Sequence, residues 1–317
     1  MAITAPTKTS DFSGFLSPEM SAPIFEKAAR QSVVQTLVRQ VPLGANGKSI
    51  PVVTGRPTAN WVAEGAKKPS TKGTRTLKTI APQKLAAIIV NSAEVVRADP
   101  AGYVSSSRDE LAEAFAIAFD YASLHNLGGD GTGTGPFSTY IDQTTKSQEL
   151  GGTSQANGGL QADLKEALYE IVSDTDASGK RRYKLTGWAM DDIVEPMFWG
   201  AVDTTGRPLW TDLPTDQAAS FLGGSGRLLN RPAYMGEGVS TPNFTSAVGY
   251  GGDWSQAAWG VVGGISFDVS DQATVTINGE LVSLWENNLV AIRAEAEYGF
   301  LVNDPDAFVK LTNNTGS

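Results

Sequence analysis

Residues 107–127, with the sequence SRDELAEAFAIAFDYASLHNL, predict a single long amphipathic helix with defined ends. Ser107 and Glu110 have the spacing of a capping box, in which two side chains satisfy free backbone N–H groups at the helix start. Gly128 follows where a left-handed C-terminal cap is expected. A helix of about 20 residues spans about 30 Å, so we expect the remaining chain to be arranged around this rod. Its apolar stripe consists of Leu111, Phe115, Ile117, Ala118, Phe119, Tyr121, Ala122 and Leu124.

Length and composition limit the class of protein. A chain of 317 residues can bury a sizeable core and form two domains or lobes. The absence of cysteine excludes disulfides and thiolate metal sites, and it is consistent with a reducing compartment. The apolar runs are too short to cross a membrane, and the first residues lack the basic and apolar segments of a secretion signal. We therefore expect neither a membrane segment nor a signal peptide.

Charge is distributed unevenly along the chain. The net charge is −9, yet residues 44–84 carry +7, so the remainder carries −16. A basic extension on an acidic body can bind nucleic acid or dock on the acidic body of a neighbouring copy. It can equally be a solvated hairpin with scattered lysines. The basic residues of this segment, which contains Glu64 as its one acid, are Lys48, Arg56, Lys67, Lys68, Lys72, Arg75, Lys78 and Lys84.

The segments ahead of the helix predict extended structure. Residues 49–54 form a short apolar run, residues 75–80 alternate polar and apolar side chains, and a long polar stretch joins the two. Residues 84–90, KLAAIIV, predict a further strand. The two joined strands have too little apolar surface to be stable alone, so we expect this projection to need a partner surface.

The segments after the helix predict an α+β body. Two further helices are expected, at residues 160–172 and at residues 190–201 with a break at Pro196. Asn278 and Gly279 mark the strongest hairpin signal, because Asn-Gly is the preferred pair for a two-residue type I′ turn. The other expected strands cover residues 183–188, 228–235, 247–250, 257–262, 265–269, 288–302 and 307–311.

Few residues suggest catalysis or metal binding. His125 is the single histidine, no nucleophile elbow accompanies it, and its place in the last turn of the helix suits a cation facing the helix dipole. One His without Cys argues against a zinc or haem site. Two carboxylate pairs, Asp191 with Asp192 and Asp304 with Asp306, have the metal-binding residue type but are typical of caps and turns. We expect no catalytic residue, no metal and no cofactor.

Several pieces of the chain, taken in order, are similar to one family. Together they resemble the major capsid proteins of tailed bacteriophages, which share the HK97 fold, and the resemblance runs from about residue 16 to residue 311. The pieces are NWVAEGAKKP (60–69), KLAAIIVNSAEVV (84–96), TGWAMDD (186–192), GRPLW (206–210), LLNRPAYM (228–235), GGDWSQAAWGV (251–261) and NNLVAIRAEAEYGFLVNDPDAFVKL (287–311).

The resemblance implies an α+β, HK97-like capsid fold. Its expected parts are an N-terminal arm (1–30), an extended β-hairpin loop (44–84), a peripheral domain with the long spine helix (31–43, 85–135 and 286–317) and an axial domain (136–285). It also implies a structural, non-enzymatic role: self-assembly as hexamers and pentamers into an icosahedral shell enclosing double-stranded DNA.

The resemblance further implies partners and a location. The expected partners are other copies of the chain, a separate scaffolding protein, a portal and non-specifically packaged DNA, with no membrane. The expected location is the virion capsid, after assembly in the bacterial host cytoplasm. Two other functions stay open: an encapsulin-like compartment shell with the same fold, and, from another class, an acidic soluble hydrolase.

Two sets of site residues follow from the loop and from the family. We expect inter-subunit contacts, against acidic surface of a neighbour, from Lys67, Lys68, Lys72, Arg75 and Lys78. Some family members also form an isopeptide bond between a loop Lys and an Asn at the start of the last long strand, assisted by a Glu.

In this sequence the matching positions for that bond are Asn288 and Glu295, with the Lys being Lys67, Lys68 or Lys72. Burial makes an amine lose its proton more easily, and a carboxylate can accept that proton while the amine attacks the carboxamide. In the simpler interpretation, Asn288 starts a strand and Glu295 is an exposed residue of an alternating pattern.

Overall fold

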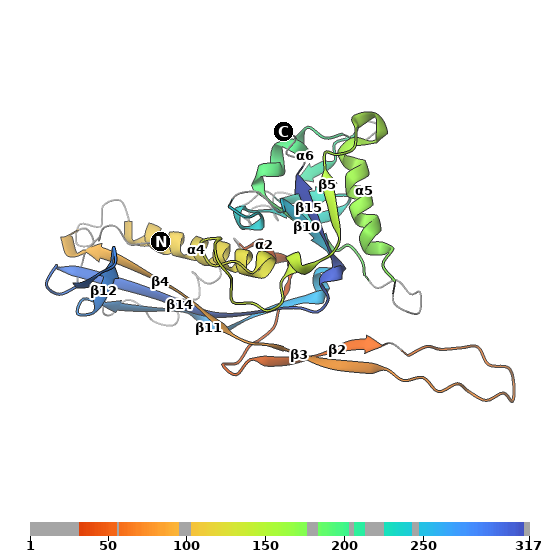
Figure 1. Ribbon diagram of the computed structural model, residues 1–317, viewed down its shortest axis with the longest axis horizontal. Helices are drawn as coiled ribbons and strands as arrows, with labels where there is room; N and C mark the ends of the chain where they lie inside the picture. Colours follow the sequence, from red (N-terminus) through yellow and green to blue (C-terminus); the bar gives the residue numbers. More distant parts are fainter. Residues whose placement is uncertain are drawn as a thin grey trace.

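Three parts make up the structure, a computed structural model that describes residues 32–55, 57–94, 103–175, 183–202, 206–212, 225–242 and 247–313. In Figure 1 a long helix lies along a sheet of long strands. A second body of shorter strands and helices adjoins one end of both, and a separate hairpin extends beneath them. The N-terminal arm expected for residues 1–30 lies outside the described residues.

The long helix α4 (Tyr103–His125) confirms the main prediction but differs at both ends. It begins before Ser107, which therefore lies within the helix, and the predicted capping box is wrong. The sequence permits this earlier start because the nearest helix-disfavouring residues are Pro100 and Gly102. At the other end Asn126, not Gly128, has the left-handed conformation, with φ of 55°. Asn tolerates this conformation better than most residues.

The four-stranded sheet beneath α4 has the order β1-β11-β14-β4. β14 forms long antiparallel ladders with both of its neighbours. Residues 257–262 and 265–269, expected as two strands, belong to one strand whose register shifts after Val262, beside Gly263 with φ of 76°. The four strands are β1 (Arg39–Gln40), β4 (Gln83–Ser92), β11 (Ala257–Ser270) and β14 (Leu289–Val302).

The second body contains a seven-stranded sheet of order β5-β15-β10-β6-β9-β8-β7. It is accompanied by α5 (Gly159–Val172), which confirms the predicted helix, and by the short α6 (Glu195–Trp199). The strands are β5 (Ser147–Leu150), β6 (Gly187–Met190), β7 (Trp210–Asp212), β8 (Ser225–Leu228), β9 (Arg231–Met235), β10 (Gly249–Gly252) and β15 (Phe308–Asn313).

Two sequence predictions for this second body are wrong in detail. Residues 228–235 were expected as one strand, but Leu229 and Asn230 both adopt positive φ and form a turn between the end of β8 and β9. The helix expected at residues 190–201 is shorter, and Pro196 lies in its first turn, where a missing N–H costs no hydrogen bond.

Two hairpins complete the described strands. β2 (Lys48–Gly55) and β3 (Thr74–Ile80) form the projecting hairpin, as their sequences predict. β12 (Thr274–Ile277) and β13 (Glu280–Ser283) lie at the far end of the four-stranded sheet (Figure 1). Their turn confirms the Asn-Gly signal, since Asn278 has φ of 52° and Gly279 of 86°.

Sheet membership departs from the expected domain boundaries in two places. β11, within the segment expected as the axial domain, pairs with β14 in the four-stranded sheet. β15, within the last segment expected as the peripheral domain, pairs with β10 in the seven-stranded sheet. The two sheets therefore exchange segments from both sides of the expected boundary at residue 285.

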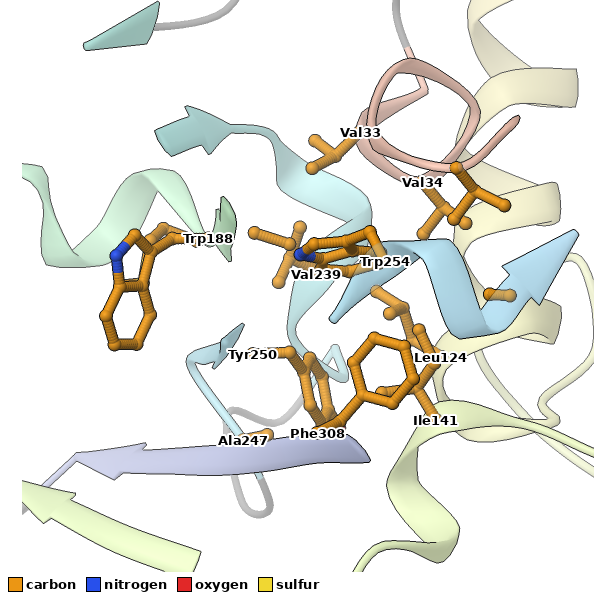
Figure 2. Close-up of a cluster of buried hydrophobic side chains, with 14 of the residues drawn as sticks. Val33, Val34, Leu124, Ile141, Trp188, Val239, Ala247, Tyr250, Trp254 and Phe308 are labelled. Atoms are coloured by element: carbon orange, nitrogen blue, oxygen red, sulfur yellow. The ribbon is translucent and has the colours of Figure 1, made fainter. Parts of the chain in front are cut away.

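One hydrophobic core joins the two sheets where α4 ends. In Figure 2 side chains from α2 (Val33–Leu37), α4 and the seven-stranded sheet converge, among them Val33, Leu124 and Trp188. Toward the four-stranded sheet, the Phe119 ring meets that of Phe300 edge to face, with centroids 6.0 Å apart. We call this cluster the joint core, because it fixes the second body on the helix and its sheet.

Candidate assembly interface

The projecting hairpin buries almost nothing along its length. Of its described side chains, only Ile80, at its base, is fully buried. Large apolar side chains further out, such as Val53 and Leu77, are mostly exposed. Such a hairpin gains little stability from its own chain, so its apolar side chains are available to another surface.

The connecting loop, residues 57–73, lies at the far end of the hairpin (Figure 1) and is exposed throughout. It carries Lys67, Lys68 and Lys72, as predicted from the sequence, and no ion pair between described residues includes them. Trp61 in the same loop is fully exposed. Its exposure was not predicted from the sequence.

The two remaining predicted contact residues lie on β3 and differ from each other. Arg75 is exposed opposite Val53 of β2. Lys78 is half-buried, and its ammonium donates a hydrogen bond to the backbone carbonyl of Asn303 in the same chain. This hydrogen bond ties the hairpin base to its own body, and a contact of Lys78 with a neighbouring subunit stays a prediction.

The two cross-link candidates are far apart within one chain. Asn288 precedes β14 with φ of 53°, and its amide donates to Oε1 of Glu94 over 3.1 Å. Glu295 lies within β14, where its carboxylate pairs with Lys84 at 3.1 Å and Arg293 at 3.3 Å. Seven strand residues separate the two candidates by about 23 Å. They can act on one bond only if different subunits contribute them.

The β12–β13 end of the molecule carries a second exposed apolar surface. Leu281 is 79% exposed and Trp285 is 74% exposed, and both stand near the exposed carboxylates Glu280 and Glu286. The sequence predicted the hairpin but not this surface, because alternation alone does not say which face of an isolated hairpin is covered.

His125 belongs to a buried hydrogen-bond chain in the joint core, not to a solvated helix end. Its Nε2 lies 2.8 Å from the Val239 carbonyl, and its Nδ1 lies 3.2 Å from the hydroxyl of Tyr250. The same hydroxyl donates to Asp142 over 2.9 Å, and Asp142 pairs with Lys310 at 2.8 Å. Burial lowers the pKa of His125, and the ring lies in the last turn of α4, where the sequence places it.

Asp120 is a second buried polar group on α4, and it caps α2 from outside that helix. Its carboxylate accepts hydrogen bonds from the Ser32 hydroxyl at 2.5 Å and from the N–H groups of Val33 and Val34 at 2.9 and 3.2 Å. Burial raises the pKa of Asp120 to about 7, while these three donors act in the opposite direction. The contact fixes the start of the described chain to the long helix.

The two aspartate pairs act in turns. Asp191 accepts from the N–H of Ile193 at 2.9 Å and from the hydroxyl of Ser240 at 2.6 Å. Asp304 accepts from the N–H of Asp306 at 3.2 Å. Within the described ranges, no three His, Cys, Asp or Glu side chains are grouped in a way that could hold a metal ion. No helix among the described residues is long and apolar enough to cross a membrane.

Comparisons with known proteins agree on one family. A model of the phage capsid family matches residues 13–313. A protein of Mycobacterium phage D29 named "Probable major capsid protein gp17" is 44% identical over 313 residues, which cover 98% of this chain and 93% of the relative. The protein of the same name from Mycobacterium phage L5 is 44% identical over 319 residues, covering 98% of this chain and 92% of that relative.

Solved structures extend the likeness to the fold. A chain from Gordonia phage Cozz superposes with a TM-score of 0.67 at 24% identity, over 90% of this chain and 87% of that chain. At 24% identity the superposition shows a common fold, and it carries no information about shared surface residues.

Proposed function

The chain belongs to the phage capsid family, and on this premise we propose that it is a major capsid protein that assembles as hexamers and pentamers into an icosahedral shell around double-stranded DNA. Its fold is α+β and HK97-like. The observation that carries the proposal is the projecting hairpin, whose loop is exposed throughout and bears Trp61 and three lysines. Trp61 offers apolar area and the lysines offer charge, a combination that suits contact between copies.

Charge supports a neighbouring copy as the partner of the loop. The hairpin segment carries +7 and the rest of the chain −16, so the loop of one copy is attracted to the body of the next. The acidic and apolar end around Leu281 and Trp285 is one surface of suitable character. In this proposal Lys67, Lys68, Lys72 and Arg75 contact the neighbour, while Lys78 serves its own chain.

Partners other than copies of the chain belong to the proposal as well. A separate scaffolding protein directs assembly, a portal occupies one vertex, and DNA is packaged without sequence recognition. Assembly takes place in the cytoplasm of the bacterial host and the product is the virion capsid. The role is structural, and beyond the joining of its own copies the chain is proposed to catalyse no reaction.

Covalent joining of subunits is a further part of the proposal. A lysine of the loop, Lys67, Lys68 or Lys72, would attack the carboxamide of Asn288 on a second subunit and release ammonia. Glu295 would accept the proton from the amine. Because Glu295 and Asn288 lie at different places on one chain, the carboxylate would come from a different subunit than the Asn288 that is attacked.

Electron microscopy of the purified full-length chain in negative stain tests the proposal. We expect closed shells, together with pentamers and hexamers. A chain that elutes only as a monomer or small oligomer in size exclusion, and forms no shells with or without a scaffolding protein, would contradict the proposal and favour the hydrolase alternative. Shells that enclose a cargo enzyme instead of DNA would favour the compartment alternative, as would a cargo gene beside the coding sequence in place of portal and terminase genes.

A further inference from the structure

The projecting hairpin starts and ends on opposite edges of the four-stranded sheet. It is entered after β1, at one edge, and it leads into β4, at the other edge. Between these two edges the chain must therefore pass the two central strands, β11 and β14. A pleated sheet covered by side chains leaves no room for close backbone crossing, so this topology requires a gap in the sheet surface.

The gap is a pair of glycines. Gly260 of β11 and Gly299 of β14 face each other directly in the antiparallel ladder. A Cβ atom added to Gly260 would lie 2.5 Å from the carbonyl oxygen of Val41 and 3.0 Å from Cβ of Leu43. One added to Gly299 would lie 2.4 Å from Cγ2 of Ile80 and 2.8 Å from Cδ2 of Leu43. Both glycines thus touch residues that flank the hairpin.

A small separate cluster fills this gap. Leu43, which precedes β2, and Ile80, which ends β3, pack there with Ala258 and Leu301 of the two central strands. Where the chain leads into the hairpin, the N–H of Val41 donates to the Trp259 carbonyl over 2.7 Å. This hydrogen bond holds the chain close to β11. The cluster is distinct from the joint core.

We infer that the Gly260–Gly299 pair is a socket that sets the direction in which the hairpin leaves the body, and so positions its loop for contact with the next copy. The inference about direction stands on the contacts above. Its consequence for shells rests on the proposed function. β3 alone extends the hairpin by about 23 Å from Ile80, so a small rotation at the socket becomes a displacement of several ångströms at the loop.

Distance measurements between two spin labels test the socket. The chain has no cysteine, so Ala66→Cys in the loop and Gln272→Cys beyond β11 would take labels at two defined, exposed positions. Pulsed dipolar spectroscopy of the full-length subunit, at low concentration and diluted with unlabelled chain, gives the distance distribution. We expect Gly299→Ala to shift the mean distance by several ångströms or to broaden the distribution about twofold.

Gly44→Ala is the matched control, because it adds the same methyl group beside Leu43 and meets nothing within 4 Å. It should leave the distribution unchanged. Leu43→Ala empties the socket without any clash, and it should broaden the distribution even if Gly299→Ala does not fold. A distribution that is unchanged in Leu43→Ala, or in a folded Gly299→Ala, would overturn the inference.

Measuring shell yield for the same variants distinguishes a failure of the inference from a failure of the proposed function. If the unaltered chain forms shells, Gly299→Ala should lower their yield at least severalfold while Gly44→Ala retains it. Equal shell yields for Gly299→Ala and the unaltered chain would refute the positioning role in assembly. If the unaltered chain forms no shells under any condition, the proposed function fails, whereas a changed label distance would still support the socket.

Discussion

The joint core and the projecting hairpin use the same kinds of side chain for opposite purposes. Phe119 and Trp188 are buried in the joint core, whereas Trp61 and Leu77 of the hairpin are exposed. Burial of a large apolar side chain contributes roughly 1.5–3 kcal/mol, and in the hairpin this contribution is absent until another surface covers it. The joint core therefore stabilises the subunit, whereas the hairpin can stabilise assembly only under the proposed function.

Truncating the joint core should give the largest effect on the isolated subunit. Phe119 makes edge-to-face contacts with Phe137, Trp259 and Phe300, so Phe119→Ala should lower the free energy of unfolding by about 3–5 kcal/mol. Trp61→Ala, in the hairpin loop, should change it by less than about 0.5 kcal/mol. Urea denaturation measures the free energy of unfolding of both variants. Similar losses in the two would contradict the division between a buried joint core and an exposed hairpin.

The buried carboxyl of Asp120 makes the free energy of unfolding depend on pH. Its folded pKa of about 7 lies above the ordinary value of 3.8, so its stabilisation is complete below about pH 4 and is lost as the pH rises through 7. Relative to Asp120→Asn, the unaltered chain should lose about 2–3 kcal/mol of unfolding free energy between about pH 5 and pH 8.

His125 acts with the opposite sign, because its lowered pKa removes stability as the pH falls through 6.5. It is present in both chains, so the difference between them isolates Asp120. Urea titrations at the two pH values supply the measurement. A difference that does not vary with pH would show that Asp120 stays ionised throughout.

Reversing charge in the loop should affect assembly and not folding. Lys67→Glu with Lys68→Glu should lower shell yield severalfold and leave the circular dichroism of the subunit unchanged, because both side chains are exposed. High salt should also lower the shell yield of the unaltered chain. At 1 M salt the Debye length is about 3 Å, so exposed charges further apart than this are largely screened from each other. Lys165→Glu with Lys184→Glu gives the same charge change elsewhere on exposed residues, and equal yields from the two double variants would refute the docking role.

The proposed cross-link predicts a covalent product in mature particles. Boiling in detergent followed by a denaturing gel should give a ladder of multimers, or material too large to enter, which disappears in Asn288→Asp. The amide of Asn288 is already held by Glu94 in the isolated subunit, so the ladder should also be absent before assembly. A single band near 33.4 kDa from mature particles would contradict the bond.

DNA binding should show the smallest effect. The free subunit has a net charge of −9, so we expect no sequence-specific binding and at most weak binding through residues 44–84. Basic side chains that neutralise DNA phosphates release bound counterions, so the affinity falls steeply as the salt concentration rises. A gel shift that survives about 0.3 M salt would mean that the basic segment is a nucleic-acid site rather than a docking loop.

Local signals in the sequence were sufficient for much of the fold. The apolar stripe of α4, the Asn278-Gly279 turn and the alternation of β14 each act over a few residues, and all three are confirmed. Turns without a glycine signal were missed, as at Leu229 and Asn230, because only tertiary contacts hold a leucine at positive φ. The exchange of β11 and β15 between the expected domains was equally invisible, since pairing partners are not encoded locally.

The candidate interface was predicted in part. A count of charges located the exposed lysines of the loop, because charge is a property of the sequence alone. The hydrogen bond of Lys78 within its own chain was not predicted, since it depends on where the Asn303 carbonyl comes to lie. Trp61 and Trp285 were not singled out, because exposure is a property of the folded chain.

The position of the last strands has a consequence for the newly made chain. β14 lies between β11 and β4, and β15 lies between β5 and β10, so neither sheet is continuous until residues 289–313 have left the ribosome. Synthesis of 317 residues takes roughly 16–60 s. A prematurely ended chain lacks the central strand of one sheet and an interior strand of the other. Both sheets of such a chain are interrupted, and we therefore expect it not to fold into the complete subunit.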